Sequence, residues 1–217
     1  MKKNYSQQTE RVLSEKDAPT LLLHCCCAPC SSSVLEKLAD RAKVTFFFFN
    51  PNISPAGEYE KRADELKRLI GEIDPKYPVE ILEAKYAPQE FFDAVKGLEN
   101  IPEGGERCKK CFELRLGQTA KEAAERGFDL FATTLTVSPL KNAETLNSVG
   151  EEKAKEFGAK WLPSDFKKKD GYKRSVELSA KYGLYRQDYC GCVFSKKEAE
   201  ERKKRTAAEK AKTGENK

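Results

Sequence analysis

Long apolar runs are scarce in this chain of 217 residues, of which 35% are charged. The longest ones, "TLLL" and "FFFF", are far shorter than the about 20 residues that a membrane-spanning helix needs. The first 17 residues also lack the apolar core of a secretory signal peptide. We therefore expect a cytoplasmic protein that is neither secreted nor inserted into a membrane.

The sequence also lacks a glycine-rich phosphate-binding loop after its first apolar segment, where cysteines stand instead. This absence argues against the use of ATP. No internal repeat and no linker rich in proline and glycine divides the chain. Because one α/β domain usually takes about 100 to 200 residues, we expect one domain over 18–195, an N-terminal extension over 1–17 and a charged helix or tail over 196–217.

Charge is concentrated at the C-terminal end. Residues 196–217 hold nine lysines and arginines against five glutamates, and so supply most of the formal net charge of +5. Mixed charge at helical spacing is typical of a solvated helix, and we prefer this interpretation to a nucleic-acid-binding arm.

Apolar segments with strand character alternate with amphipathic segments along the chain. We predict strands over 20–26, 43–50, 78–86, 129–136 and 159–163, and helices over 31–41, 55–73, 88–98, 109–127, 142–158 and 171–184. Such alternation is typical of an α/β fold, here a Rossmann-like parallel sheet with helices on both faces. In these sheets ligands bind beyond the carboxyl ends of the strands.

All eight cysteines fall in three short motifs, "HCCCAPC", "RCKKC" and "DYCGC". The first motif follows the first predicted strand, and the second lies where a loop gives way to a helix. We expect the three to converge at one edge of the sheet, where helix N-termini favour thiolates. Cys27 and Cys30, like Cys108 and Cys111, have the C-x-x-C spacing of metal ligands.

The number of cysteines bears on the kind of metal site. One tetrahedral zinc, or one [4Fe-4S] cluster, takes a single set of four ligands, and more thiols than that are expected at this edge. A zinc site surrounded by structural cysteines remains an alternative. A disulfide relay is less favoured, because no thioredoxin-type pattern surrounds the pairs.

Several motifs in unbroken order resemble one known family, the cobalamin-independent epoxyqueuosine reductases. They are "LLLHCCCAPCSSSVLEKL", "FFFFNPNISPAGEYEKR", "ERCKKCFELRL", "FATTLTVSPLKN", "PSDFKKKDGYKRSVELS" and "LYRQDYCGCVFS". The resemblance implies an iron–sulfur enzyme that removes the epoxide oxygen in the last step of queuosine synthesis, at the wobble position of tRNA. It also implies a fold similar to the nucleotide alpha-hydrolase (HUP-like) group.

The resemblance further implies a division of the cysteines between two metal groups. A [4Fe-4S] cluster would be held by Cys26, Cys27, Cys108 and Cys111. A mononuclear iron beside it would be held by Cys190 and Cys192, with Cys30 as the candidate third ligand. Cys25 is then a bystander, since a free cysteine commonly behaves as a small apolar side chain.

The chemistry of such a reaction needs electrons, protons and an electrophile for oxygen. Conversion of an epoxide to an alkene consumes two electrons and two protons and releases water. An iron with an open position would act as a Lewis acid, and the cluster would pass electrons from an external donor of unknown identity. Candidate proton donors are His24, Asp165, Asp170, Tyr172 and Asp188, although a lone buried histidine is more often a structural residue.

Two kinds of segment are candidates for binding the anticodon stem-loop of tRNA. The stretch "DFKKKDGYKR" combines basic and aromatic side chains and supplies Lys167, Lys168, Lys169, Lys173 and Arg174, or is alternatively a solvated turn. Strand ends supply Asn50, Asn52, Thr133, Thr134 and Lys141. Alternatively, the two asparagines only form a turn, and the segment that holds the threonines and the lysine only starts a helix.

Two other functions compete with the reductase. A zinc-binding tRNA-interaction protein without catalysis would explain the C-x-x-C pairs, but it leaves the "CGC" pair without a role. A thiol-dependent tRNA sulfur transferase would require activation by ATP, which the absent phosphate-binding loop disfavours.

Overall fold

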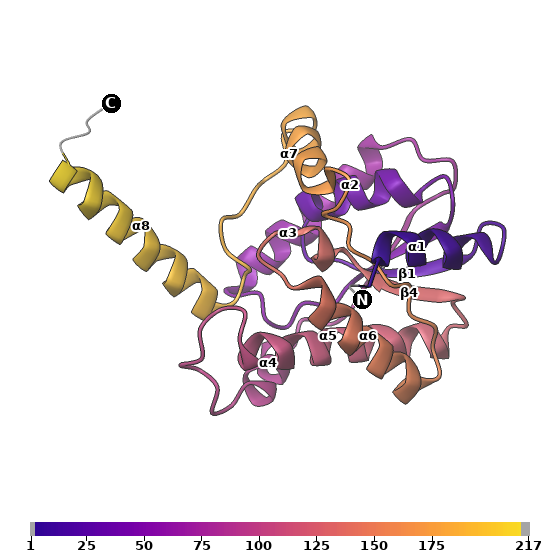
Figure 1. The fold of residues 1–217 in the computed structure, drawn as a ribbon, viewed down its shortest axis with the longest axis horizontal. Coiled ribbons are helices and arrows are strands. Elements are labelled where there is room, and N and C mark those ends of the chain that lie inside the picture. Colours follow the sequence, from indigo (N-terminus) through magenta and orange to yellow (C-terminus); the bar gives the residue numbers. More distant parts are fainter. Residues whose placement is uncertain (1–2, 214–217) are drawn as a thin grey trace.

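The structure is a computed structural model that describes residues 3–213. Four strands alternate with helices in an α/β arrangement (Figure 1). The elements are α1 (Tyr5–Ser14), β1 (Thr20–His24), α2 (Ala28–Leu38), β2 (Lys43–Phe48), α3 (Ala56–Glu72), β3 (Glu80–Glu83), α4 (Pro88–Ala94), α5 (Glu106–Glu125), β4 (Leu130–Thr133), the 3₁₀ helix η1 (Thr134–Val137), α6 (Ala143–Phe157), α7 (Gly171–Lys181) and α8 (Val193–Thr213).

The four strands form one parallel sheet in the order β3-β2-β1-β4. Leu22 at the centre of β1 is in register with Thr45 of β2 and Phe131 of β4. Both faces of the sheet are covered, since Leu21 and Leu23 belong to one buried cluster and Leu22 to another. Double coverage explains why β1 and β2 are continuous apolar runs. The predicted fold class is confirmed.

The predicted fifth strand over 159–163 is wrong. Only Trp161 makes a parallel bridge, to Phe131 beside β4. Two backbone hydrogen bonds hold this contact, from Phe131 to Lys160 and from Leu162 to Phe131. Pro163 then follows, and proline has no N–H with which to extend the ladder.

The two ends of the chain behave differently in the structure. Val12 and Leu13 of α1 are buried in the core beneath the sheet, and Thr9 donates a hydrogen bond of 2.6 Å to the carbonyl of Pro163. Helix α8 instead projects from the body (Figure 1). Of the predicted tail, residues 214–217 lie outside the described residues, as do residues 1–2 of the predicted extension.

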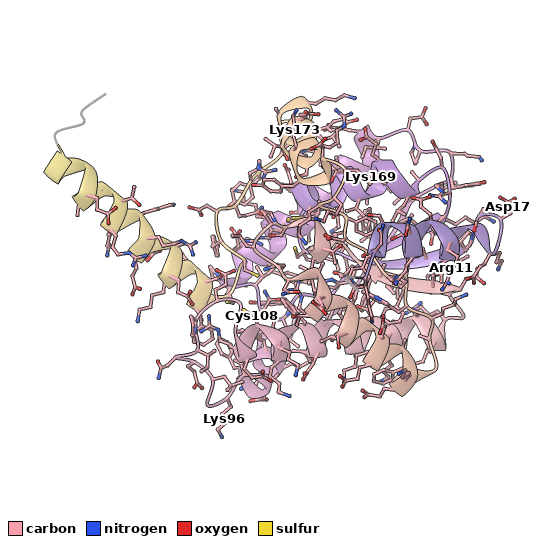
Figure 2. All side chains as sticks on the ribbon, in the orientation of Figure 1. Arg11, Asp17, Lys96, Cys108, Lys169 and Lys173 are labelled. Carbon is pink, nitrogen blue, oxygen red and sulfur yellow. The ribbon has the colours of Figure 1, made fainter. Side chains whose placement is uncertain are left out.

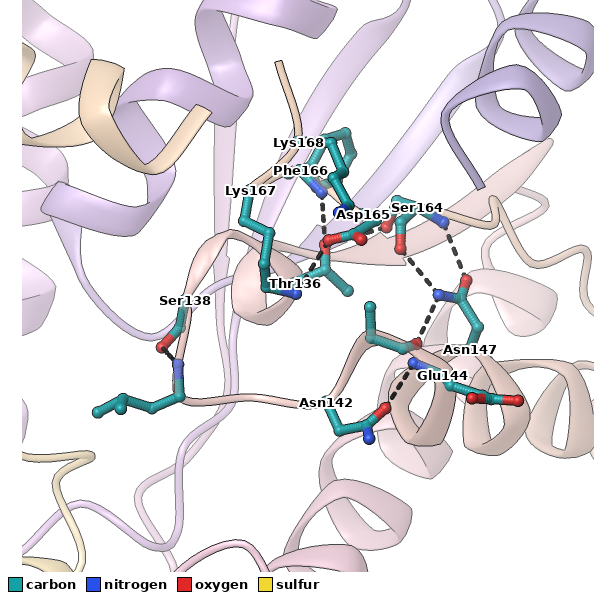
Figure 3. A network of polar contacts seen from close by, with 12 residues as sticks. Thr136, Ser138, Asn142, Glu144, Asn147, Ser164, Asp165, Phe166, Lys167 and Lys168 are labelled. Carbon is teal, nitrogen blue, oxygen red and sulfur yellow. Dashed lines mark hydrogen bonds and ion pairs between the residues drawn. The ribbon is translucent and has the colours of Figure 1, made fainter. Parts of the chain in front are cut away.

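A buried polar network fixes the segment that runs from Trp161 towards α7 (Figure 3). The Asn147 amide donates to the carbonyl of Ser164 and accepts from the Trp161 indole and the Ser164 backbone N–H. Thr136 of η1 accepts from the backbone N–H of Phe166 at 3.3 Å. These bonds attach residues 164–168 to α6 and η1.

No helix within residues 3–213 is long and apolar enough to cross a membrane.

Candidate active site and metal centre

The three cysteine motifs converge at the carboxyl edge of the sheet, as the sequence predicts. Cys25, Cys26 and Cys27 lie in the connection between β1 and α2, and Cys30 lies in the first turn of α2. A small cavity beside them is lined by sulfur-bearing side chains from α5 and from the segment before α8, namely Cys108, Cys111, Cys190 and Cys192. All eight cysteines are free thiols.

Three of these thiols are close enough to share one metal centre. The sulfur atoms of Cys26, Cys27 and Cys30 all lie within 4.8 Å of one another, and those of Cys26 and Cys27 are 3.9 Å apart. Metal–sulfur bonds of about 2.3 Å in a tetrahedral site put sulfur atoms about 3.8 Å apart. The trio groups Cys30 with Cys26 and Cys27, whereas Cys190 and Cys192 line the neighbouring cavity.

The surroundings of the trio favour a thiolate. Hydrogen bonds from Cys27 and Cys30 lower the pKa of Cys26 well below its ordinary value, and the charges of Arg115 and Arg62 act in the same direction. Burial instead raises the pKa of Cys111 to about 12. Thiolates are the form in which cysteine binds metals, so Cys26 is the thiol best prepared for a metal before one binds.

Arg115, which no sequence motif singled out, lies at the centre of the site. Its guanidinium is completely buried and donates to His24 Nε2 at 3.2 Å, to Asn50 Oδ1 at 2.7 Å and to Cys111 Sγ at 3.9 Å. No carboxylate pairs with it within residues 3–213. Arg115 follows Cys111 by four residues in α5, so both lie on the same helix face, and this spacing was the available sequence signal.

His24 is held as a neutral ring. Because Arg115 donates to Nε2, the ring proton lies on Nδ1, which donates to Thr133 Oγ1 at 2.8 Å. Burial, with the nearby charge of Arg115, lowers the pKa of His24 to about 3. Both nitrogens are therefore occupied and the ring is uncharged at neutral pH, which argues against His24 as the proton donor.

Two more cations lie against the thiols. The Lys141 ammonium is 3.2 Å from Cys190 Sγ, and although burial opposes its charge, Cys190 and Cys26 raise its pKa above the ordinary value. Arg62 is also buried, pairs with Glu58 at 2.7 Å and donates to the carbonyl oxygen of Cys190 at 3.2 Å. The centre is thus a set of thiols surrounded by positive charge.

Asn52 has an unusual position in this centre. The side chain is 2% exposed, and neither its amide nitrogen nor its amide oxygen has a hydrogen-bond partner. It lines the cavity that Cys111, Cys190 and Cys192 also line. Because an unpaired buried amide is costly, these two atoms are suited to a bound group.

Asn50, Thr133 and Thr134 are also buried at this edge, but they are engaged differently. The Asn50 amide nitrogen donates to the carbonyl of Cys25 at 2.8 Å, and Thr133 is occupied by His24 and by the backbone of Leu135. The Thr134 hydroxyl is buried without a partner. Cys25 packs away from the other thiols, with its sulfur 3.6 Å from the carbonyl of Phe47.

Asp188 is two residues before Cys190, but the other remaining predicted proton donors and the basic stretch lie away from the thiols. Figure 2 shows Lys169 and Lys173 well separated from Cys108. Asp165 pairs with Lys167, Arg174 with Glu36, and Asp188 with Lys203 on α8. Of the other residues in the stretch, Lys168, Asp170 and Tyr172 are exposed, whereas Phe166 is buried.

The residues present fit a thiophilic metal group. Thiolates select zinc, copper(I) and iron–sulfur clusters. The buried charge of Arg115 has no carboxylate partner in the described part of the chain, so an anionic metal–thiolate group would compensate it. The unpaired amide of Asn52 lines the cavity that Cys111, Cys190 and Cys192 also line, and it would meet such a group there.

Comparisons with known proteins identify the family. The family model described as epoxyqueuosine reductase QueH matches residues 21–198. The chain is 48% identical to the epoxyqueuosine reductase QueH of Streptococcus pyogenes serotype M1 over 88% of this chain and 76% of the relative. It is 44% identical to the protein of that name from Staphylococcus epidermidis, over 88% of this chain and 84% of the relative. It is 37% identical to the one from Thermotoga maritima, over 84% of this chain and 93% of the relative.

These matches span nearly the whole described domain and include every cysteine of the site. The predicted enzyme class, an oxidoreductase, is confirmed by the relatives. The chain belongs to the epoxyqueuosine reductase QueH family.

Proposed function

We propose that this chain reduces epoxyqueuosine to queuosine at the wobble position of tRNA. The epoxide oxygen leaves as water, and two electrons and two protons are consumed. Family membership supports the substrate, and the observation that carries the chemistry is the gathering of seven thiols other than Cys25 beside the buried charge of Arg115, which no carboxylate of the described residues pairs with.

The proposed metal groups are a [4Fe-4S] cluster on Cys26, Cys27, Cys108 and Cys111, and a mononuclear iron on Cys190 and Cys192 with Cys30. When bound, the cluster would supply electrons singly and the iron would polarise the epoxide oxygen. The sulfur of Cys30 lies with those of Cys26 and Cys27. Cys30 is therefore placed to bind either the cluster or the mononuclear iron.

The protein side chains around the thiols have distinct tasks in this proposal. Lys141 lies 3.2 Å from Cys190 Sγ and would offset the negative charge of a metal group bound there. Asn52 offers a donor and an acceptor to the bound substrate in the cavity. Placing these groups in a water-poor, preorganised site strengthens their effect on a developing oxyanion.

The tRNA anticodon stem-loop is the proposed partner, with an external electron donor. The five basic residues of the stretch 167–174 remain candidates for phosphate contacts, away from the thiols. The candidates nearest the thiols are Asn52 and Lys141, which would meet the modified base.

The test is metal analysis and turnover of anaerobically prepared protein. We expect about five iron atoms per chain with iron–sulfur absorption in the visible range, and conversion of epoxyqueuosine in tRNA with dithionite as reductant. Replacing Cys108 by Ser should abolish the cluster absorption. Replacing Cys192 by Ala should remove one iron, spare the cluster absorption and stop turnover. Cys25→Ala is the matched control and should change neither metal content nor turnover.

Two results would contradict the proposal. Wild-type protein that binds zinc instead of iron, or that holds iron and sulfide but leaves the epoxide intact, would remove the reductase function. A Cys192→Ala protein that loses the cluster and keeps a single iron would reverse the division of ligands.

A further inference from the structure

Three arginines are buried beside the thiols, and their surroundings differ. Arg107 pairs with the carboxylate of Glu198 at 2.8 Å. Arg62 has a carboxylate partner, Glu58, at 2.7 Å. Arg115 has none within the described residues, and its hydrogen-bond acceptors are a neutral imidazole, an amide oxygen and a thiol. One positive charge at the centre of the site is therefore uncompensated by carboxylates.

An uncompensated buried charge destabilises a folded protein. The Arg115 guanidinium contacts the sulfur of Cys111 at 3.9 Å, and its charge helps to lower the pKa of Cys26. Both are thiols that the proposed function assigns to the cluster. A metal–thiolate group with net negative charge would therefore compensate the charge of Arg115. In turn, the charge of Arg115 would stabilise negative charge on that group.

The position of the Arg115 charge is fixed by a chain of hydrogen bonds. His24 Nδ1 donates to Thr133 at the end of β4, and the Asn50 amide donates to the carbonyl of Cys25 after β1. The guanidinium donates to His24, which ends β1, and to Asn50, which follows β2, and through His24 it is linked to Thr133 of β4. Because rigid strand ends hold its partners, the charge cannot move away when the metal group changes its redox state.

We propose that Arg115 is the resident counter-charge of the thiolate-bound metal group and makes that group easier to reduce. The inference rests on the iron–sulfur part of the proposed function. One-electron reduction adds a negative charge to the group, and a fixed positive charge in a poorly hydrated interior stabilises the reduced form more than the oxidised form.

The test compares the reduction midpoint of the iron–sulfur group in four variants of the full chain, titrated anaerobically with dithionite and followed by electron paramagnetic resonance. Arg115→Met removes the charge, and Arg115→Lys keeps it. Asn50→Leu and Thr133→Val break the same hydrogen-bond chain without changing the charge. Iron and sulfide contents are measured for each protein.

We expect Arg115→Met to shift the ratio of reduced to oxidised cluster at least tenfold towards the oxidised form, which corresponds to a midpoint about 59 mV lower. The same ratio in Arg115→Lys, Asn50→Leu and Thr133→Val should stay within about threefold of the wild-type ratio. All three variants keep a positive charge at position 115, and the proposed shift depends on that charge.

An unchanged midpoint in Arg115→Met, or equal shifts in Asn50→Leu and Thr133→Val, would overturn the inference. If Arg115→Met cannot hold the cluster, retention of iron and sulfide in Arg115→Lys and Asn50→Leu supports a counter-charge, whereas loss in all of them overturns it. Wild-type protein without iron and sulfide overturns both proposals. Loaded wild-type protein that fails to reduce the epoxide overturns only the function.

Discussion

At the scale of single residues, Asn52 and Arg115 are both buried, and both lack a partner that such a buried group normally has. Asn52 has an amide with no partner, and Arg115 has a charge with no carboxylate within the described chain. Buried polar groups are normally satisfied. Two such groups at one sheet edge, beside seven thiols, point to a bound group as the missing partner.

Replacement of Asn52 by Leu separates stability from function. Removing an unpaired buried amide relieves a penalty of about 1–3 kcal/mol, so we expect the free energy of unfolding of the metal-free protein to rise or stay the same. Turnover of epoxyqueuosine in tRNA should fall by about tenfold or more, since a substrate hydrogen bond is lost. Urea unfolding and single-turnover assays measure the two effects. A variant that is destabilised yet fully active would show Asn52 to be structural.

Asp129 provides a prediction of pH dependence far from the thiols. Its carboxylate accepts from Lys16 at 2.6 Å and from the Thr20 backbone at 2.9 Å, and the Lys16 hydrogen bond is the first cause that lowers its pKa from 3.8 to about 2. The stabilisation is present above the unfolded pKa and is lost as the pH falls through about 2.

We therefore expect Asp129→Asn to lower the free energy of unfolding by about 1 kcal/mol at neutral pH, after allowance for the partial exposure of the pair. Between about pH 4 and pH 2 the variant should lose less stability than the wild type, because the titrating group is gone. Urea titrations at several pH values measure this. Parallel pH profiles for the two proteins would show that the Asp129 pair does not contribute.

At the scale of elements, α6 lies so close to the Trp161 segment that only glycine fits at one position. A Cβ on Gly150 would lie 2.4 Å from the Trp161 ring. The Trp161 indole also donates to Asn147 in the same helix, one turn earlier, and packs edge-on against Phe131 of β4. Helix α6 and the strand edge are therefore joined through one indole ring.

Gly150→Ala should force α6 away from the ring and lower the free energy of unfolding by about 1–3 kcal/mol, the usual range for overpacking. Gly71→Ala in α3 is the matched control, because no atom lies within 4 Å of its added Cβ. That control should be neutral or stabilising by up to about 1 kcal/mol, since alanine favours helix more than glycine does. Equal effects at the two positions would contradict the packing argument.

At the scale of the whole molecule, the basic stretch and the thiol centre occupy separate parts of the surface (Figure 2). Phe166 of the stretch is attached to η1 through Thr136, and Ser164 just before the stretch is attached to α6 through Asn147 (Figure 3), while Arg174 is paired with Glu36. A tRNA that contacts both places must span the surface between them.

Alanine replacement of the five basic residues tests this contact. We expect weaker tRNA binding and a shallower dependence of log Kd on log salt concentration, because each lost phosphate contact releases about one counterion fewer. A control variant removes five exposed lysines elsewhere, Lys43, Lys85, Lys96, Lys121 and Lys155, and so has the same net charge. If both variants lose affinity and salt dependence equally, the stretch makes no special contact with tRNA.

The sequence by itself determined the α/β class, the parallel sheet and the positions of the cysteines at strand ends and helix starts. These follow from local signals: continuous apolar runs in β1 and β2, helical periodicity between them, and the rule that the carboxyl ends of parallel strands share one edge. The family likewise could be recognised from motifs along the chain. The segment 159–163 was misjudged because a short apolar run does not reveal how many ladder bonds it makes.

Only the tertiary structure decided which polar groups are satisfied and which are not. His24 and Asn50 are predicted candidates whose hydrogen bonds are taken up by Arg115, whereas Asn52, two residues after Asn50, has both amide atoms free for a ligand. The grouping of Cys30 with Cys26 and Cys27 is also a result of packing. Hydrogen-bond partners and ligand distances depend on contacts between residues distant in sequence, so spacing along the chain cannot determine them.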